Sequence, residues 1–130
     1  MSFKTLTLAG VLLVATSVVA SATEHTTAPV ATGEFDGQMF LMDAQEMTLY
    51  TFDKDGMGMS NCYDECAANW PPLMGEAGMD LPEGYSLIER KDGGMQVAYK
   101  GQPLYLWSKD EKPGDMMGDG VKGVWRTARP

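Results

Sequence analysis

Histidine is almost absent from this sequence of 130 residues, which contains only His25. Serine–histidine and cysteine–histidine catalytic pairs need a histidine in the folded domain, and zinc sites of the multi-histidine type need several. His25 instead falls in residues 23–33, whose small and polar side chains predict a flexible leader. The sequence therefore argues against these classes of enzyme, and we expect a protein without catalytic activity.

The sequence also has no apolar run long enough to span a membrane. Lys4 precedes an apolar stretch from Leu6 to Ala20, and the stretch ends in Ala20-Ser21-Ala22. A bilayer span requires roughly 20 apolar residues, whereas a charge, a shorter apolar segment and small residues in this order are typical of a signal peptide. We expect residues 1–22 to be removed on export to the periplasm or the medium, and no membrane span to remain afterwards.

Basic residues are scarce, with 10 Lys and Arg against 18 Asp and Glu and a formal net charge of −8. Removal of Lys4 with the signal peptide makes the balance more acidic. An acidic surface repels nucleic acid and anionic lipid, so neither is an expected partner. A cation or an unidentified envelope protein remains as a possible partner, and the charge also keeps an exported protein in solution.

Cysteine occurs only twice, as Cys62 and Cys66. Outside the cytoplasm such a pair is expected to form a disulfide. If Ser60 caps a short helix that continues to Asn69, the two thiols lie one turn apart on the same face. A ring this small stabilises the fold by about 2 kcal/mol in the chain-entropy model, so the disulfide is a local clip on a loop.

Helical spacing of apolar residues is missing outside residues 62–69, and short apolar stretches alternate with Gly-rich and Asp-rich turns. The sequence therefore predicts a mainly β domain. An internal repeat organises it: Leu49-Tyr50-Thr51-Phe52-Asp53-Lys54-Asp55 recurs 55 positions later as Leu104-Tyr105-Leu106-Trp107-Ser108-Lys109-Asp110. At the same offset Trp70 corresponds to Trp125. We expect one domain, residues 34–130, made of two repeats over about 35–74 and 90–130, with residues 75–85 as the linker.

The repeat places two aromatic rings on one side of each strand, Tyr50 with Phe52 and Tyr105 with Trp107. A unit of this size cannot bury such a face alone, so the two copies are expected to pack their rings together around a pseudo-twofold axis. Residues 38–42 and 95–99 are predicted hairpin partners of the repeated strands, and residues 125–128 are a predicted final strand. The sequence assigns the repeated aspartates, Asp55 and Asp110, to the turn after each strand.

These motifs resemble a bacterial family of secreted repeat proteins, described as predicted lipoproteins with a Y-x-[FWY]-x-x-D motif. The shared features are Tyr50 to Asp55, Tyr105 to Asp110, the Cys62-x3-Cys66 pair before Trp70-Pro71-Pro72-Leu73, and the ending from Pro113-Gly114-Asp115 to Gly123-Val124-Trp125. The resemblance covers nearly all of the exported chain and implies export and a duplicated domain, without an established activity. The lipid-attachment cysteine of a lipoprotein has no counterpart here.

Methionine is abundant, with 11 residues in the chain. Thioether and thiolate sulfur select Cu(I), so a soft-metal site is one alternative function. Its candidate ligands are Met57, Met59, Cys62, Cys66, Met116 and Met117. Methionine also replaces leucine readily in cores and loops, which is the competing explanation for its abundance.

Carboxylates supply a third alternative, an enzyme that hydrolyses envelope polymers with paired acids. Asp53 with Asp55 and Asp64 with Glu65 are such pairs, but adjacent acids are common in an acidic chain. Residues 53–64 match the twelve-residue calcium loop only in part, since Met57 at its fifth position offers no oxygen. We therefore expect an exported envelope protein that acts by binding or by structural association, without a required cofactor.

Overall fold

A computed structural model describes residues 29–130 of the chain. The expected signal peptide, His25 and most of the expected leader lie outside these residues. The described part contains eight strands, one short α-helix and one 3-10 turn, which confirms the predicted mainly β class. None of its helices has the length and apolarity that a membrane crossing requires.

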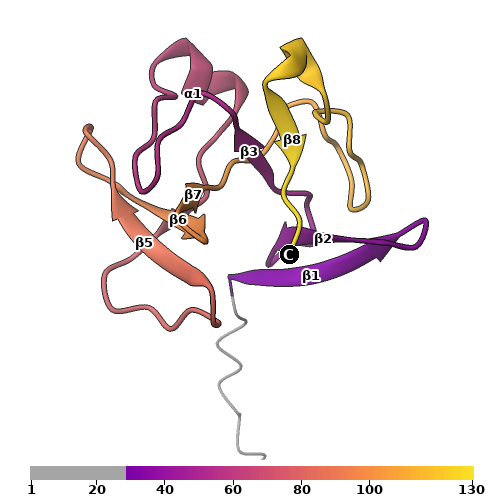
Figure 1. Cartoon of the computed structure of the whole chain (residues 1–130), viewed down its shortest axis with the longest axis horizontal. Helices are drawn as coiled ribbons and strands as arrows, with labels where there is room; N and C mark the ends of the chain where they lie inside the picture. Colours follow the sequence, from indigo (N-terminus) through magenta and orange to yellow (C-terminus); the bar gives the residue numbers. More distant parts are fainter. Residues whose placement is uncertain (1–28) are drawn as a thin grey trace, which may run out of the picture.

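Two antiparallel hairpins form the lower half of the molecule in Figure 1. In the first, β1 (Val30–Phe35) pairs with β2 (Gln38–Asp43); in the second, β5 (Tyr85–Glu89) pairs with β6 (Met95–Tyr99). The leader predicted to continue to residue 33 therefore ends earlier than expected. Most side chains of β1 are exposed, so the strand is held by its backbone pairing with β2. Its sequence therefore looks like that of a flexible leader, which explains the wrong boundary.

Each repeated strand pairs with the final segment of the other copy. In the first copy, β3 (Tyr50–Phe52) is antiparallel to β8 (Trp125–Thr127) of the second. In the second copy, the Leu106 N–H donates to the Pro71 carbonyl over 2.7 Å, which places residues 105–107 beside the first copy's Pro71-Pro72. Because proline has no N–H, this second ladder is less complete than the first. The two copies are thus intertwined.

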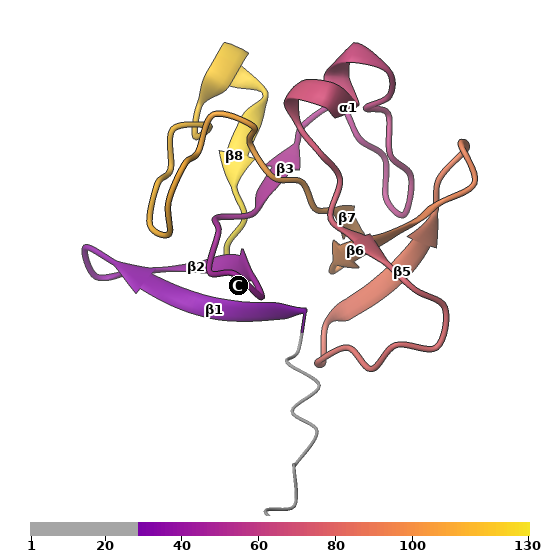
Figure 2. The same ribbon diagram turned by 180° about the vertical axis from the view of Figure 1, so that it is seen from behind.

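The two repeated strands also pair with each other. The Tyr50 N–H donates to the Tyr105 carbonyl over 2.8 Å, and the Tyr105 N–H donates to the Tyr50 carbonyl over 3.0 Å. This reciprocal pair relates the copies by the pseudo-twofold symmetry that the repeat predicts. Figures 1 and 2 show the resulting arrangement, with β3 and β8 in the middle and a turn-rich lobe from each copy on either side.

The predicted hairpin turns differ by one residue between the copies. In the second copy β6 turns directly into β7 (Gln102–Pro103), and the Leu104 N–H donates to the Val97 carbonyl over 3.0 Å. In the first copy the Leu49 N–H donates to the Leu41 carbonyl over 3.0 Å. Leu41 lies one position before the repeat counterpart of Val97, so the first turn is one residue longer. The loop of residues 76–84 follows β4 (Met74–Gly75), which pairs with β6, and connects the copies.

The core has an aliphatic and an aromatic part. Buried residues of the hairpins and of the segments before and after the repeated strands make the aliphatic cluster: Val30, Leu41, Leu49, Val97, Leu104 and Ala128. Above it, the repeat motifs build the aromatic cluster: Tyr50, Cys62, Trp70, Tyr105 and Trp125. The expectation that the repeated rings face one another in the core agrees with this cluster.

The helix near the cysteines is shorter than predicted. It is α1 (Glu65–Asn69), and the residue before it, Asp64, has a left-handed φ of 52° and makes no side-chain capping bond. Ser60 is therefore not the N-cap, and Cys62 lies outside the helix. The second copy has a 3-10 turn, η1 (Val121–Gly123), at the corresponding place.

Candidate functional site

Four aromatic rings form a continuous stack through the centre of the molecule. Phe52 stacks on Trp125 with ring centroids 4.2 Å apart, Trp125 on Trp70 at 3.7 Å, and Trp70 on Trp107 at 3.9 Å. The rings alternate between the copies, because Phe52 and Trp70 belong to the first and Trp107 and Trp125 to the second. The central pair, with planes only 4° apart, lies where the copies meet.

The tyrosine of each motif meets the central tryptophan of its own copy edge-on. Tyr50 contacts Trp70 at a centroid distance of 5.4 Å, and Tyr105 contacts Trp125 at 5.2 Å. Both tyrosines are fully buried. Edge-to-face contacts are a favoured geometry for aromatic pairs, so each motif tyrosine supports one member of the central stack.

The tyrosine hydroxyl of each motif donates to the aspartate of the other motif. The Tyr50 hydroxyl lies 2.6 Å from Asp110 Oδ2, and the Tyr105 hydroxyl lies 2.7 Å from Asp55 Oδ2. Such bonds to a carboxylate are stronger than bonds between neutral groups. The repeated Tyr and Asp are therefore paired between the copies, a relation that spacing within one motif does not reveal.

Burial sets the protonation of these groups. It raises the pKa of Tyr50 and of Tyr105 well above the usual value for tyrosine, and the neighbouring aspartates raise both further. Burial also raises the pKa of Asp55, against the lowering effect of its bonds from the Asn61 N–H and the Tyr105 hydroxyl. Both tyrosines consequently keep their protons, and act as donors, at neutral pH.

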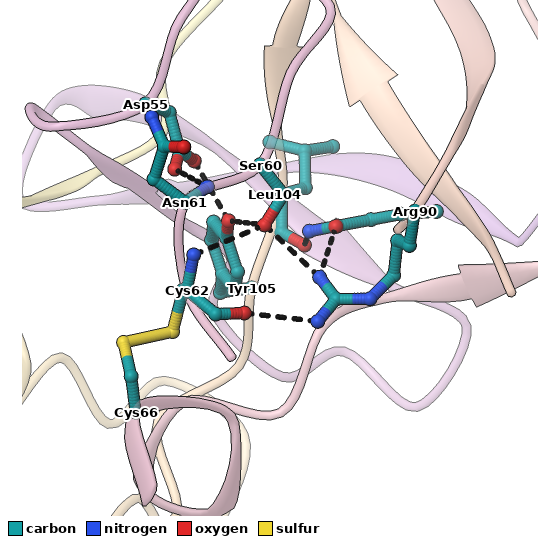
Figure 3. Close-up of a disulfide and its surroundings, with 9 residues drawn as sticks. Asp55, Ser60, Asn61, Cys62, Cys66, Arg90, Leu104 and Tyr105 are labelled. Carbon is teal, nitrogen blue, oxygen red and sulfur yellow. Dashed lines mark hydrogen bonds between the residues drawn. A yellow bond between two sulfur atoms is a disulfide. The ribbon is translucent and has the colours of Figure 1, made fainter. Parts of the chain in front are cut away.

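In the first copy, the turn after the repeated strand is supported by side chains. The Ser60 hydroxyl lies 2.6 Å from that of Tyr105, and Asp55 Oδ1 accepts the Asn61 N–H over 2.7 Å (Figure 3). Arg90, with a relative exposure of 2%, donates through Nη1 to Ser60 Oγ at 3.0 Å. Its guanidinium also covers the Tyr63 ring at 4.4 Å from the centroid. A buried cation from the second copy thus organises this turn.

The disulfide joins the same turn to α1. Cys62 and Cys66 are bonded with Cα atoms 5.2 Å apart, in agreement with the prediction for an exported chain. The Cys62 carbonyl accepts Arg90 Nη2 over 2.9 Å, so the crosslink and the buried guanidinium meet at one residue, as Figure 3 shows. Arg90 Nη1 donates also to Gln96 Oε1 over 2.7 Å, which ties the turn to β6.

In the second copy the motif aspartate again accepts a backbone N–H, but a backbone N–H takes the place of the Ser60 hydroxyl at the motif tyrosine. Asp110 Oδ1 accepts the Met117 N–H over 2.9 Å, and the Gly118 N–H donates to the Tyr50 hydroxyl over 3.2 Å. A Cβ at Gly118 would lie 2.8 Å from the Trp70 ring, so only glycine permits this approach. The same aromatic and Tyr–Asp arrangement is therefore held by different chemistry in the two copies.

The structure does not gather the six sulfur residues into one place. Cys62 and Cys66 are in the disulfide. The loops that carry Met57 with Met59 and Met116 with Met117 lie on opposite sides of the β3–β8 pair in both views (Figures 1 and 2). A single soft-metal site made from the whole set does not match this arrangement.

One of the two candidate carboxylate pairs, Asp53 with Asp55, is occupied by the fold. Asp53 forms an ion pair with Arg126 at 3.0 Å, and Asp55 accepts the bonds described above. Within residues 29–130, no cluster of three or more His, Cys, Asp or Glu side chains has metal-binding geometry. Within residues 53–64, Asp55 accepts the Asn61 N–H and the Asn61 side chain donates to the Lys54 carbonyl, so this segment forms a bonded turn.

A cleft opens at the boundary between the copies, beside the aromatic stack. Its volume is about 360 Å³, within the range of small-molecule sites. Both copies line it: Phe52, Lys54, Glu65, Cys66, Asn69, Trp70, Lys122, Val124 and Trp125. Most of its lining residues belong to α1, η1, β3 and β8; α1, β3 and β8 lie in the upper half of Figure 1. The cleft therefore combines aromatic, cationic, acidic and amide groups.

Sequence reasoning did not identify Arg90, Lys54 or Lys122. Arg90 lies directly after β5 and has no basic counterpart in the first copy, so the repeat did not indicate it. The correspondence of Lys54 with Lys109 was visible in the repeat, but the repeat alone assigned neither lysine a role. Only the folded chain shows that Lys54 and Lys122, from different copies, share one cleft.

Comparison with known proteins gives one match. A family model described as a secreted repeat of unknown function matches residues 34–74 and again residues 86–129. The two matches agree with the two structural copies, although the second begins at β5, before the predicted residue 90. No curated protein matches the chain. No solved structure matches it either.

Proposed function

Since the chain belongs to the family of secreted repeats of unknown function, we propose that it is an exported cell-envelope protein that works by binding and not by catalysis. Its repeat motif builds the scaffold, and the cleft between the copies is its binding site. The family description and the disulfide both fit an exported protein, and the periplasm and the external medium both satisfy these features.

The engagement of the motif residues supports a scaffold role. Tyr50 and Tyr105 bond to the opposite copy's aspartates, and the raised pKa of both tyrosines opposes proton transfer from them at neutral pH. The faces of Trp70 and Trp125 are covered by the other rings of the stack. These groups are engaged in the fold, whereas the side chains of Lys54, Asn69 and Lys122 in the cleft are exposed.

The origin of the cleft is the observation that carries the proposal. Asn69 and Val124 occupy equivalent positions of the two copies, and so do Trp70 and Trp125; all four line the cleft. The cleft is therefore a product of pairing the copies. Pockets at such boundaries, with an apolar floor and a few polar groups, are the usual location of small-molecule sites.

Amide chemical shifts of the protein test the proposal directly. The ¹⁵N-labelled exported chain would be titrated with a panel of neutral sugars, acidic sugars, muropeptides, amino acids and short peptides. We expect at least one compound to shift the amides of Glu65, Asn69 and Val124. Asn69→Trp, which fills the cleft, should abolish the response, whereas Glu111→Trp at an exposed position outside it should not.

Two results would contradict the proposal. One is a panel in which no compound shifts the cleft amides. The other is turnover of a panel compound that disappears in Asp55→Asn while the circular dichroism spectrum is unchanged, because that would identify a carboxylate-dependent enzyme.

A further inference from the structure

We infer that the cleft recognises an acidic sugar, whose carboxylate lies between Lys54 and Lys122. This inference rests on the proposed function and assigns the chemical class of the ligand. The two lysines come from different copies and line the same cleft. The chain carries a net charge of −8, so two cations at one concave site are a local departure from the acidic surface.

Both lysines lack a partner among the described residues. Each is exposed, and neither forms an ion pair with a described carboxylate, although 18 acidic residues are present in the chain. Glu65 lines the same cleft without pairing to either. An ammonium group that the fold leaves unpaired in a cleft is free to bind an anion.

The repeat supplies a comparison for Lys54. Its counterpart, Lys109, lies over the outer ring of the stack, with its ammonium group 5.6 Å from the Trp107 centroid. Lys54 makes no such contact with a described ring and lines the cleft instead. One lysine of the repeated pair therefore lies over the outer ring of the stack at the protein surface, and the other is available to a ligand.

The remaining lining groups indicate a sugar rather than an inorganic anion. The half-buried side chains of Phe52 and Val124 offer apolar surface for the C–H groups of a pyranose ring. Asn69 has both a donor and an acceptor for hydroxyl groups, and the Glu65 carboxylate accepts from hydroxyls. A small anion such as phosphate would use the lysines and leave these four groups unoccupied.

The ring edges of the stack have a polarity that suits an anionic ligand. Trp70 and Trp125 stack face to face, so they present edges and not faces to the cleft that they line. An aromatic edge is the positive part of the ring quadrupole. Ring edges and the ammonium groups of Lys54 and Lys122 together favour a negative ligand.

Calorimetric or chemical-shift titration with matched sugars tests this inference. The probes are galacturonate, its neutral counterpart galactose, a galacturonate trimer and inorganic phosphate. We expect galacturonate to bind at least tenfold more tightly than galactose and than phosphate, and the affinity to fall with added salt. Tighter binding of the trimer than of the monomer would identify a polymeric acidic glycan as the source of the sugar, and equal binding would identify a free sugar acid.

The lysine variants provide the controls. The double variant Lys54→Gln with Lys122→Gln should weaken galacturonate binding at least tenfold, whereas Lys109→Gln, the repeat counterpart outside the cleft, should leave it unchanged. All three side chains are exposed, so the thermal midpoint of each variant should match that of the parent chain. Equal effects of the cleft and control variants would overturn the inference.

The outcomes separate this inference from the proposed function. If galactose binds in the cleft as tightly as galacturonate, or phosphate binds as tightly, the acidic-sugar inference fails while the cleft remains a binding site. If no panel compound, these probes included, shifts the cleft amides, both the inference and the proposed function fail.

Discussion

The two turns that follow the repeated strands perform the same task with different groups. In the first copy, Ser60 and the buried Arg90 support the hydroxyl of Tyr105 and the turn around it. In the second copy, the backbone N–H of Gly118 contacts the hydroxyl of Tyr50, and no guanidinium lies there. Common to both is a tyrosine that donates to the other copy's aspartate.

This comparison separates the scaffold from its local supports. The stacked rings and the Tyr–Asp bonds lie around the pseudo-twofold axis, where each residue contacts the opposite copy, so a change in one copy alters both. The supports also cross between the copies, since Ser60 contacts the Tyr105 hydroxyl and Gly118 contacts the Tyr50 hydroxyl, but their chemistry differs. A duplicated domain therefore tolerates divergence in the groups around its shared motif, and the following predictions test this division.

The largest effect is expected at the centre of the aromatic stack. Trp70→Ala and Trp125→Ala each remove a buried ring that is stacked on both faces, and each should lower the free energy of unfolding by about 3–5 kcal/mol. Trp107→Ala, at the half-buried end, should cost only about 1–2 kcal/mol. Urea denaturation measures all three. A loss of unfolding free energy for Trp107→Ala as large as for Trp70→Ala or Trp125→Ala would contradict the view that the stack is most important where the copies meet.

Arg90→Met probes the support that only the first copy has. It leaves Ser60 Oγ, Gln96 Oε1 and the Cys62 carbonyl without their donor, so we expect a loss of about 3 kcal/mol in unfolding free energy. The matched change in the support of the second turn is Thr48→Val, which removes one bond to the Asp115 carbonyl and should cost about 1 kcal/mol. Similar costs for both variants would show that the two supports are equivalent.

Loss of the disulfide should be smaller and confined to one copy. The double variant Cys62→Ser with Cys66→Ser should lower the unfolding free energy by about 2 kcal/mol in the chain-entropy model. Amide hydrogen exchange should accelerate over residues 61–69 and stay unchanged over residues 116–124. Faster exchange in both segments would mean that the crosslink acts on the axis and not on its own turn.

Alkaline pH should weaken the axis through its two tyrosines. Below the unfolded value of 10.0 both states hold the tyrosine protons, and stability is complete. Above it the unfolded chain releases protons that Tyr50 and Tyr105 retain in the fold, so stability falls as pH rises. The slope should reach about 1.4 kcal/mol per pH unit for each tyrosine. Tyr50→Phe and Tyr105→Phe should each lower this slope by about the contribution of one tyrosine. An unfolding free energy that does not change above pH 10 would contradict the burial of these hydroxyls.

The sequence predicted the parts of the fold that leave a periodic or paired signal. The recurrence of Tyr50 to Asp55 indicated the duplication and the shared aromatic core, and the lone cysteine pair indicated the disulfide. Strand β1 (Val30–Phe35) was missed because exposed side chains on a hairpin follow no apolar pattern. The predicted helix was too long because the positive φ of Asp64, which precedes α1, has no recognisable sequence pattern.

The site was less accessible to sequence reasoning for a different reason. The pairing of Tyr50 with Asp110 and the cleft between Lys54 and Lys122 both depend on residues about 60 or more positions apart, brought together only when the copies interlock. Spacing within one motif carries no information about such a pairing. Arg90 has no repeat counterpart, so its burial depends entirely on tertiary context.

Double-mutant cycles on the motif residues test the central claim, that each copy completes the other through exchanged Tyr–Asp bonds. Tyr50→Phe combined with Asp110→Asn, and Tyr105→Phe combined with Asp55→Asn, should show coupling energies of at least about 1 kcal/mol, because each pair shares a hydrogen bond. The pairs within one motif, Tyr50 with Asp55 and Tyr105 with Asp110, should be additive within about 0.5 kcal/mol. Strong coupling inside each motif and additivity between the copies would contradict the account.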